Sequence, residues 1–427
     1  MSRILVAASP VYGHVAPLSR VASFLAARGH DVTLLSHERF RSLAGEGVEY
    51  EAFTGAAGAD LDAVFASQER LAVPAGPERF AWDMRNVFVQ AVAPQHRDVQ
   101  RVLAQAGDEP VVLVYETAFF GAVPSLLGAP GPRPVTALGL GPVSFTLSSA
   151  DTAPFGMGLP PDSSEEGRAR NREANAMVKG QLLGPAQELF EQTLAELGVT
   201  GEDIPFFLDA TVLKADLFLQ LSVEELSYAR SDTPAHVRFV GSLPPSADTA
   251  ELPAWWPEVE AAERVVVVTQ GTIANQDFGQ LIEPALEGLA DFPGLVVVTT
   301  GRPAQLRDVP ANARVAEFVP FDVLLPYADV LVTNGGFGAV QEALRHGVPM
   351  VAAGTSEEKH ENNVRLAATG AAVNLGTEYP AAADIRKAVE DITGTHSYRD
   401  NAGRLAEQYA VVDALAEIEK ALAELTG

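Results

Sequence analysis

The sequence has 427 residues, more than one hydrophobic core usually organises, so we expect two domains. It carries 30 Lys and Arg against 56 Asp and Glu, a formal net charge of −26, which argues against nucleic acid or an anionic membrane surface as a partner. The absence of cysteine excludes disulfides, thiolate metal sites and a cysteine nucleophile. No apolar stretch is long enough to span a membrane and the N-terminus lacks a signal-peptide pattern, so we expect a soluble, cytoplasmic protein.

The first half begins with a βαβ pattern. An apolar run at 2–9 is followed by a loop, a helical pattern at 18–30 and a second apolar run at 32–36. This order implies a parallel sheet, and the apolar runs at 110–116 and 133–139 are further strand candidates for a sheet covered on both faces.

A Pro-rich, acidic stretch at 241–258 indicates a linker between two such halves. We therefore predict a first domain at 1–235, a linker at 236–260 and a second domain at 261–400. The second domain repeats the alternation of strands and helices, with strands at 264–272, 295–301, 313–320, 330–336 and 349–354 and helices near 276–291 and at 338–346.

The last helical pattern, at 384–425, is broken near Gly394. We predict that its final part, 401–427, packs back on the first domain. The fold class is thus α/β, with two Rossmann-like, doubly wound parallel-sheet domains facing each other across a cleft. Ligands of such sheets bind at the C-terminal strand ends, so the loops at 12–14 and 334–338 should face each other there.

The stretch NGGFGAVQEALRHGVP at 334–349 predicts an anion site. Its glycines allow close backbone approach to a ligand, and the helix that follows turns unpaired N–H groups and its positive dipole end to the same place. A phosphate group is the anion that this pattern favours.

The sequence also resembles a known family. GHVAPL and LAARGHDVT near the N-terminus, and FVPFDVLLPYADVLVTNGGFGAVQEALRHGVPMVAAGTSEEKHENN near the C-terminus, are similar in order and spacing to the glycosyltransferases that transfer sugars from nucleotide diphosphates to small lipophilic acceptors. The resemblance is strongest to bacterial enzymes that modify natural products, macrolides among them. It implies a GT-B fold with an N-terminal acceptor domain, a C-terminal nucleotide-sugar domain and an inverting, metal-independent transfer.

The same resemblance implies UDP-glucose as the favoured donor and the nucleotide sugar as a co-substrate, with no other cofactor. UDP or dTDP would be the product, and a monomer or homodimer the active form.

Acceptor hydroxyls are weak nucleophiles, so such a transfer needs a base, and histidine is the usual base near neutral pH. His14 matches the base position of the family; the alternative is a structural or solvated loop histidine. A base histidine also needs an acidic partner. The family uses Asp where this sequence has Glu116, whose alternative role is a strand-end carboxylate that caps a loop or helix.

By the same resemblance, Glu342 bridges the ribose hydroxyls, Phe318 stacks on the nucleobase and the backbone of Val319 pairs with the base edge. Phe318 is alternatively a core residue and Glu342 a solvated one. Asn334 and Ala339 stand where relatives carry His and Ser, which shifts diphosphate binding onto helix N–H groups and the turn at 270–272. The predicted nucleotide residues are Gly271, Thr272, Phe318, Val319, Asn334, Gly335, Gly336, Gly338, Ala339 and Glu342.

For the sugar, the resemblance points to Glu358 and Lys359, with Asn362 as a third candidate. Relatives have glutamine at the position of Lys359, and lysine only donates hydrogen bonds, so the identity of the sugar stays open. Aromatic residues of the first half suggest an apolar acceptor pocket for polyketides, macrolides or flavonoid-like phenols, although aromatic residues are also typical of cores. They are Phe65, Trp82, Phe88, Phe119, Phe120, Phe145 and Phe155.

Other functions find less support in the sequence. DLD at 60–62 imitates a metal-binding DxD motif but lies in the wrong half, so we predict no metal site. A nicotinamide-type GxGxxG, a hydrolase GxSxG and a P-loop are all missing. Two alternatives stay open. One is a non-catalytic partner that activates another transferase, which the departures at Asn334, Ala339 and Lys359 would favour; the other is an epimerase or phosphorylase acting without an aglycone.

Overall fold

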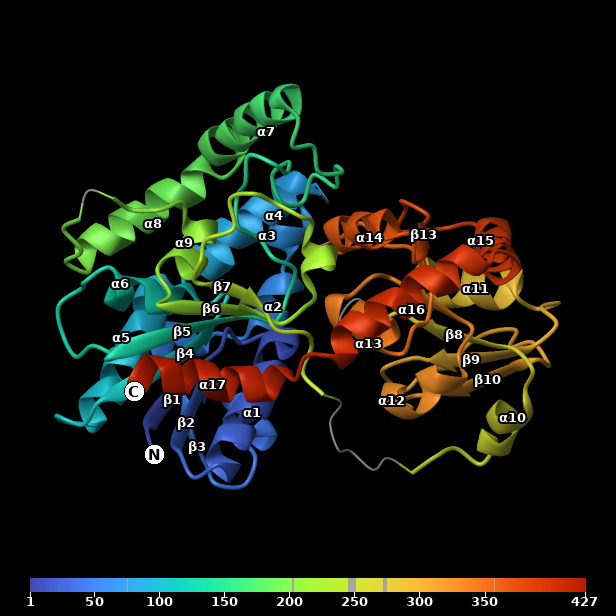
Figure 1. Cartoon of the computed structure of the whole chain (residues 1–427), viewed down its shortest axis with the longest axis horizontal. Coiled ribbons are helices and arrows are strands. Elements are labelled where there is room, and N and C mark those ends of the chain that lie inside the picture. Colours follow the sequence, from blue (N-terminus) through green and yellow to red (C-terminus); the bar gives the residue numbers. More distant parts are fainter. Residues whose placement is uncertain (75, 202, 245–250, 272–274, 357) are drawn as a thin grey trace.

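The computed structural model describes residues 1–74, 76–201, 203–244, 251–271, 275–356 and 358–427. Within these residues the chain forms a seven-stranded and a six-stranded sheet, and the strand pairings are parallel. Helices cover both sheets (Figure 1). The predicted α/β class with two doubly wound parallel sheets is confirmed.

The first sheet has the strand order β3-β2-β1-β4-β5-β6-β7. The order reverses between β1 and β4, which places a ligand-binding crevice beyond the C-terminal ends of these two strands. The strands are β1 (Arg3–Ala7), β2 (Asp31–Ser36), β3 (Val48–Ala52), β4 (Val111–Glu116), β5 (Thr136–Gly141), β6 (Leu217–Gln220) and β7 (Val237–Phe239).

The second sheet has the order β10-β9-β8-β11-β12-β13, with its reversal between β8 and β11. The predicted strand at 330–336 ends early, at Thr333, because the backbone turns at Gly335 with φ +89°. The strands are β8 (Val265–Thr269), β9 (Leu295–Thr299), β10 (Ala313–Ala316), β11 (Val330–Thr333), β12 (Met350–Ala352) and β13 (Ala372–Asn374).

Helix α1 begins at Tyr12, earlier than the predicted start at residue 18, and holds Pro17 in its second turn. It therefore carries the YGH sequence in its first turn rather than in a loop. The other helices of the first half are α2 (Leu61–Phe65), α3 (Gln68–Leu71), α4 (Pro77–Asp83), α5 (Val92–Gln105), α6 (Val123–Leu126), α7 (Glu165–Met177), α8 (Gly184–Glu196) and α9 (Phe207–Leu213), with α1 ending at Ala27. A short turn, η6 (Glu224–Ser227), follows β6.

The helix predicted near 276–291 is shorter in the structure, where it comprises the turn η7 (Phe278–Gln280) and the helix α11 (Ile282–Gly288). The other helices of the second half are α10 (Trp256–Ala261), α12 (Phe321–Leu324), α13 (Phe337–Arg345), α14 (Lys359–Ala368), α15 (Ala382–Gly394), α16 (His396–Ala410) and α17 (Ala414–Thr426).

The structure shifts the predicted domain boundaries. Strand β7 lies within the segment predicted as a linker, 236–260, and pairs with β6 of the first sheet. The C-terminal segment predicted at 401–427 is divided, because α16 packs in the second domain whereas α17 crosses to the first (Figure 1). Ile418 and Leu422 of α17 are buried in the same cluster as Ile4 of β1.

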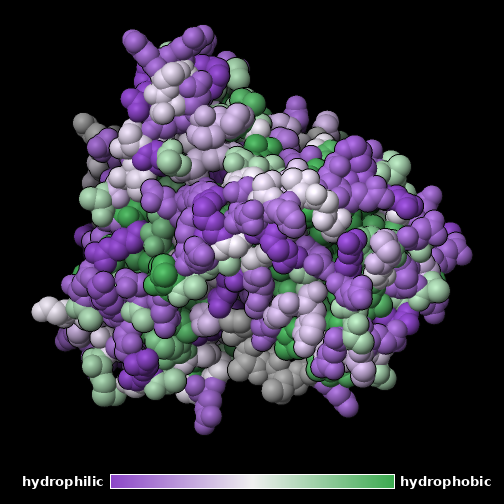
Figure 2. All heavy atoms as spheres, turned by 45° about the vertical axis from the view of Figure 1, so that its right-hand side comes forward, coloured by the Kyte–Doolittle hydropathy of each residue, from purple (hydrophilic) through white to green (hydrophobic). Residues whose placement is uncertain are grey.

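Hydrophobic clusters lie on both faces of each sheet and account for the layering. The visible face in Figure 2 is largely hydrophilic, with hydrophobic side chains scattered over it. None of the helices in the described residues is long and apolar enough to cross a membrane.

Candidate active site

His14 and Glu116 form a buried pair at the edge of the first sheet. His14 lies in the first turn of α1, and Glu116 is the last residue of β4. The Nδ1 atom of His14 is 2.7 Å from Oε2 of Glu116, and the His14 side chain is only 13% exposed. The Glu116 carboxylate also accepts backbone N–H groups from Ser9 at 3.0 Å and Ala118 at 2.7 Å. The longer side chain of glutamate thus reaches the histidine from this strand end, while its other contacts hold the adjacent loops.

Charge pairing determines the protonation of this pair. Burial disfavours the charged imidazole, but the charge and hydrogen bond of Glu116, with help from Glu358, outweigh it and raise the pKa of His14. Burial likewise disfavours the Glu116 carboxylate, yet His14 and the two backbone donors lower its pKa. Since an ionised Glu116 can only accept hydrogen bonds, the Nδ1 of His14 donates, and Nε2 is the basic nitrogen of the neutral ring.

A cleft of about 480 Å³ lies beside this pair, between the two domains. Tyr12 and Gly13, the neighbours of His14, line its first-domain wall. Most of the predicted nucleotide residues line the other wall: Gly271, Phe318, Val319, Asn334, Gly336, Gly338, Ala339 and Glu342. Thr272 lies outside the described residues. The structure thus brings the N-terminal histidine and the C-terminal glycine-rich loop to one place.

The N-terminus of α13 opens into this cleft without a side-chain cap, because its N-cap residue is Gly336. The first N–H groups of a helix have no intrahelical acceptors, so this end can bind an anion. The side chain of Asn334 is engaged in the protein's own hydrogen bonds. Its Nδ2 donates to the carbonyl of Gln270 at 2.6 Å and its Oδ1 accepts from the N–H of Gly336, so the amide mainly ties the loops after β8 and β11 together.

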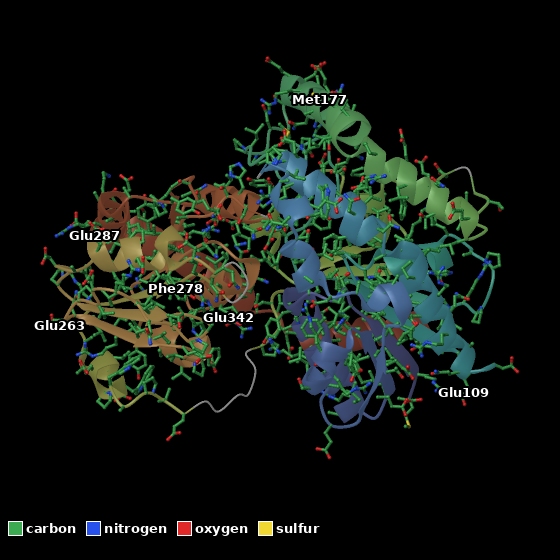
Figure 3. The ribbon with its side chains drawn as sticks, turned by 180° about the vertical axis from the view of Figure 1, so that it is seen from behind. Glu109, Met177, Glu263, Phe278, Glu287 and Glu342 are labelled. Carbon is green, nitrogen blue, oxygen red and sulfur yellow. The ribbon has the colours of Figure 1, made fainter. Side chains whose placement is uncertain are left out.

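Glu342 lies on α13 at the edge of the second domain that faces the first (Figure 3). Its Oε2 atom is buried and has no hydrogen-bond partner within the described part of the chain. Burial raises the pKa of Glu342, while the charges of Arg345 and Arg20 oppose this effect and Asp322 adds to it. A buried carboxylate with an unpaired oxygen is stabilised when the hydroxyl groups of a ligand donate hydrogen bonds to it.

Phe318 is 58% exposed and lines the cleft, so it is not the core residue that its position after a strand would suggest. The next residue, Val319, is fully buried and also lines the cleft. An exposed aromatic ring beside a buried residue offers a flat apolar surface next to the α13 anion site.

The predicted sugar residues divide into two groups. Glu358 and Lys359 line the cleft, Lys359 from the first position of α14. Asn362 does not line it: this side chain is buried, its Nδ2 donates to the carbonyl of Gly335 at 3.0 Å, and its Oδ1 accepts from the hydroxyl of Ser144. Gly335 does not line the cleft either. Its α-carbon packs against Asn363, so that a Cβ atom there would lie 1.8 Å from Oδ1 of that residue.

Part of the predicted acceptor pocket is core instead. Phe119, Phe120 and Phe145 are at most 1% exposed, because the loops after β4 and β5 turn these rings onto neighbouring aromatic side chains. Phe65 and Trp82 are half-buried but line neither the cleft nor a second cavity, of about 500 Å³, within the first domain.

Of the predicted acceptor residues, Phe88 lines a first-domain cavity of about 500 Å³. Ser9 and Pro10 also line this cavity, and the N–H of Ser9 donates to Glu116, so the cavity adjoins the His14–Glu116 pair. Its wall is mostly apolar and includes Ala57, Leu61, Val64, Val87 and Leu189.

In the described residues, no three or more His, Asp or Glu side chains are grouped so that they could hold a metal ion. Asp60 of the DLD motif forms an ion pair with Arg39 at 3.5 Å, and neither residue lines the cleft.

Sequence reasoning missed Arg20, which lines the cleft from α1. The spacing of Gly13, Pro17 and Arg20 places them on one face of the helix, a signal visible only once the start of α1 is known. Arg20 is near enough to Glu342 for its charge to affect that carboxyl, so the two domains act on each other electrostatically across the cleft.

Comparisons with known proteins agree with this architecture. A family model, the C-terminal domain of proteins like erythromycin biosynthesis protein CIII, matches residues 283–425. UDP-glycosyltransferase 2 of Phaeomoniella chlamydospora is 39% identical over 439 residues, 99% of this chain and 95% of its own length. 4'-Demethylrebeccamycin synthase of Lentzea aerocolonigenes is 37% identical over 424 residues, 97% of each chain.

Among solved structures, the glycotransferase of kitacinnamycin aligns over 100% of both chains with a TM-score of 0.75 at 21% identity, which shows the same fold. The identity to the two full-length relatives shows that the chain belongs to the UDP-glycosyltransferase family, and the structural match shows that it has the GT-B fold. The predicted class of enzyme, a glycosyltransferase, is confirmed.

Proposed function

We propose that this enzyme transfers a hexose, with UDP-glucose as the favoured donor, to a hydroxyl group of a lipophilic natural product. The observation that carries the proposal is the position of the His14–Glu116 pair next to a cleft whose other wall holds an uncapped helix N-terminus. The proposed base follows Tyr12 and Gly13, which line one wall of the cleft, and the proposed anion site lies on the opposite wall, which supports this assignment.

In the proposed reaction, the acceptor oxygen attacks the anomeric carbon of the donor as its proton passes to Nε2 of His14. The bond from the anomeric carbon to the diphosphate oxygen breaks, and UDP leaves with its negative charge held at the N-terminus of α13. Glu116 stabilises the imidazolium that forms. Attack from the face opposite the diphosphate turns an α-linked donor into a β-glycoside, and no step requires a metal ion.

The donor is proposed to lie along the second-domain wall. The nucleobase would stack on Phe318, the ribose hydroxyls would donate to Glu342, and the sugar would reach Glu358 and Lys359. Glu358 also helps to raise the pKa of His14, which supports placing the sugar between these two residues.

The acceptor is proposed to occupy the first-domain cavity beside Ser9. A volume of about 500 Å³ and a mostly apolar wall suit a polycyclic or macrocyclic molecule with few polar groups. The name of the relative from Lentzea aerocolonigenes, a rebeccamycin synthase, supports such an acceptor class.

Mass spectrometry of products tests the proposal. The purified enzyme would be given UDP-glucose or dTDP-glucose, a pool of phenolic and macrolide acceptors, and EDTA. A hexose adduct formed with UDP-glucose in EDTA, with a β-anomeric coupling by NMR, is the expected result. An α-glycoside or a dependence on added metal would contradict the mechanism. No adduct and no binding of UDP would instead favour the non-catalytic partner.

A further inference from the structure

Three polar side chains of α14, Glu361, Asn362 and Arg365, are almost fully buried. Each of them contacts the first domain, and we call them the α14 clasp. In Figure 1, α14 lies at the edge of the second domain next to the first. Buried charges cost several kcal/mol unless they are paired and hydrogen-bonded, as roughly estimated for ions taken out of water. The hydrogen bonds that pair these buried groups therefore hold α14 in one defined position against the first domain.

Glu361 binds a first-domain turn that is shaped around it. Its Oε2 accepts the backbone N–H groups of Gly156 at 3.2 Å and Gly158 at 2.9 Å. Both glycines have positive φ, +90° and +60°, a conformation that other residues rarely adopt. A Cβ atom on Gly158 would also lie 2.3 Å from the ring of His360, so the turn and α14 fit closely together.

Arg365 holds the other end of the same first-domain segment. Its Nε donates to Oε1 of Glu361 at 2.9 Å, and its guanidinium donates to the carbonyl of Phe145 at 3.0 Å. The guanidinium also lies over the rings of Phe155 and Tyr228, 5.6 and 5.2 Å from their centroids. Segment 144–158 is therefore attached to α14 at both ends.

Asn362 connects this segment to the loop at the N-terminus of α13. Its Oδ1 accepts from the hydroxyl of Ser144, and its Nδ2 donates to the carbonyl of Gly335 at 3.0 Å. Gly335 has φ +89° and no space for a side chain, so this loop has little freedom to move independently of α14.

We propose that the α14 clasp is a positioning element, through which occupancy of the loop at 334–338 stabilises the first-domain segment 144–158. The inference rests on the proposed binding of a nucleotide at that loop. A bound diphosphate would fix Gly335 and with it Asn362, which raises the free energy needed to open the clasp. Pro142 and Val143, directly before the segment, line the cleft, so the order of the segment affects the first-domain wall that faces the proposed donor site.

Hydrogen exchange with UDP as the probe tests this coupling. Saturating UDP should slow exchange of the Gly156 and Gly158 amides by roughly threefold or more in the wild-type enzyme, as a change in local opening predicts. The double variant Glu361→Gln/Arg365→Met removes both charges without leaving one unpaired. It should lose the UDP-dependent slowing, and because coupling is reciprocal its UDP affinity, measured by calorimetry, should fall by no more than the factor of that slowing.

The matched control is Glu225→Gln/Arg404→Gln, which removes the ion pair between η6 and α16, one with half-exposed side chains. This variant should keep the slowing. Ser144→Ala provides a second, milder variant that leaves α14 intact and should weaken the slowing.

The outcomes separate the coupling from the proposed function. UDP binding without slower exchange at Gly156 and Gly158 would overturn the coupling alone, as would unchanged slowing in the clasp variant. A loss of UDP affinity in that variant well beyond the factor by which UDP slows exchange in the wild type would show that α14 only supports the nucleotide loop, and would also overturn the coupling. Failure of the wild-type enzyme to bind UDP would overturn both proposals.

Discussion

The Nδ1 atom of His14 lies 2.7 Å from Oε2 of Glu116, although 102 positions separate the two residues in the sequence. The contact exists because β1 and β4 are neighbours at the reversal of the strand order, where the loops after both strands meet. It directs the second ring nitrogen, Nε2, away from the carboxylate and leaves it as the site that takes a proton.

Replacing His14 with Ala should remove the base and leave nucleotide binding unchanged. Transfer should fall by roughly 10²–10⁴-fold, the usual contribution of a positioned base. The measurements are turnover of UDP-glucose with acceptor and the UDP dissociation constant. His396→Ala, at an exposed position on α16, is the control and should behave like the wild type. An equal loss of UDP affinity in His14→Ala would show a structural role instead.

The pH profile should report the His14–Glu116 pair. The base acts in its neutral form, and its pKa is raised above the ordinary value of 6.5, so kcat/KM should fall as the pH drops through a value above 6.5. Glu116→Gln removes the main contribution that raises the pKa, so its acid limb should shift to lower pH and its maximal rate should fall. Glu109→Gln, on the outer edge of the first domain in Figure 3, should leave the profile unchanged. If Glu116→Gln leaves the acid limb of the profile at the same pH, the limb reports the titration of a group other than His14.

Glu342→Gln should weaken binding of both UDP and uridine. Hydrogen bonds to a charged group contribute about 1.5–3 kcal/mol, so we expect a loss of roughly tenfold or more in affinity. Uridine has the ribose without the phosphates, so an equal loss for both ligands locates the effect at the ribose. Glu287→Ala, exposed on the outer side of the second domain in Figure 3, is the control. A loss confined to UDP would move Glu342 to the diphosphate.

Phe318→Ala should weaken UDP binding by about tenfold, because stacking of a base on an aromatic side chain contributes roughly 1–3 kcal/mol. Folding should be unaffected, since the ring is mostly exposed and fills no core space. Calorimetry with UDP and a thermal melt give both quantities. Tyr379→Ala removes an aromatic ring of similar exposure outside the cleft and should change neither affinity nor melting. A lower melting temperature of Phe318→Ala with unchanged UDP affinity would show that the ring stabilises the fold rather than the bound nucleotide.

Most central strands of both sheets were predictable because they contain runs of apolar, β-branched residues. Strand β8, for example, has five buried residues, four of them consecutive valines. The central strand β6 was missed. The edge strand β3 was missed because Glu49 and Glu51 interrupt its sequence, and β7 because it has only three residues. Short edge strands owe their conformation to pairing with a neighbour, which the local sequence does not encode.

The cleft was largely predictable for a related reason. Glycines and strand ends mark loops, and parallel strands bring their C-terminal loops to one edge of the sheet. Which way a side chain turns was not predictable. Phe119 and Phe318 both follow strands, yet Phe119 is fully buried and Phe318 is mostly exposed. Asn362 was assigned to the sugar from its position, but packing of α14 against the first domain turns it to Ser144 and Gly335 instead.

Two of the three glycines in the segment 334–338, Gly335 and Gly338, should respond differently to substitution by alanine. At Gly335 a Cβ atom would lie 1.8 Å from Oδ1 of Asn363, and φ is +89°, so Gly335→Ala should destabilise the fold by more than about 1 kcal/mol. At Gly338 nothing lies within 4 Å of a Cβ atom, and the residue is in the first turn of α13. Gly338→Ala should therefore fold as well as the wild type, since alanine favours a helix.

Gly338 nevertheless lines the cleft where the diphosphate is proposed to bind, so the added methyl group should reduce affinity for UDP but not for uridine. A thermal melt and calorimetry with the two ligands separate these effects. Unchanged UDP affinity in Gly338→Ala would mean that the phosphates do not approach this turn. The anion would then have to be bound elsewhere in the cleft, because a helix N-terminus acts only on charges within its first turn.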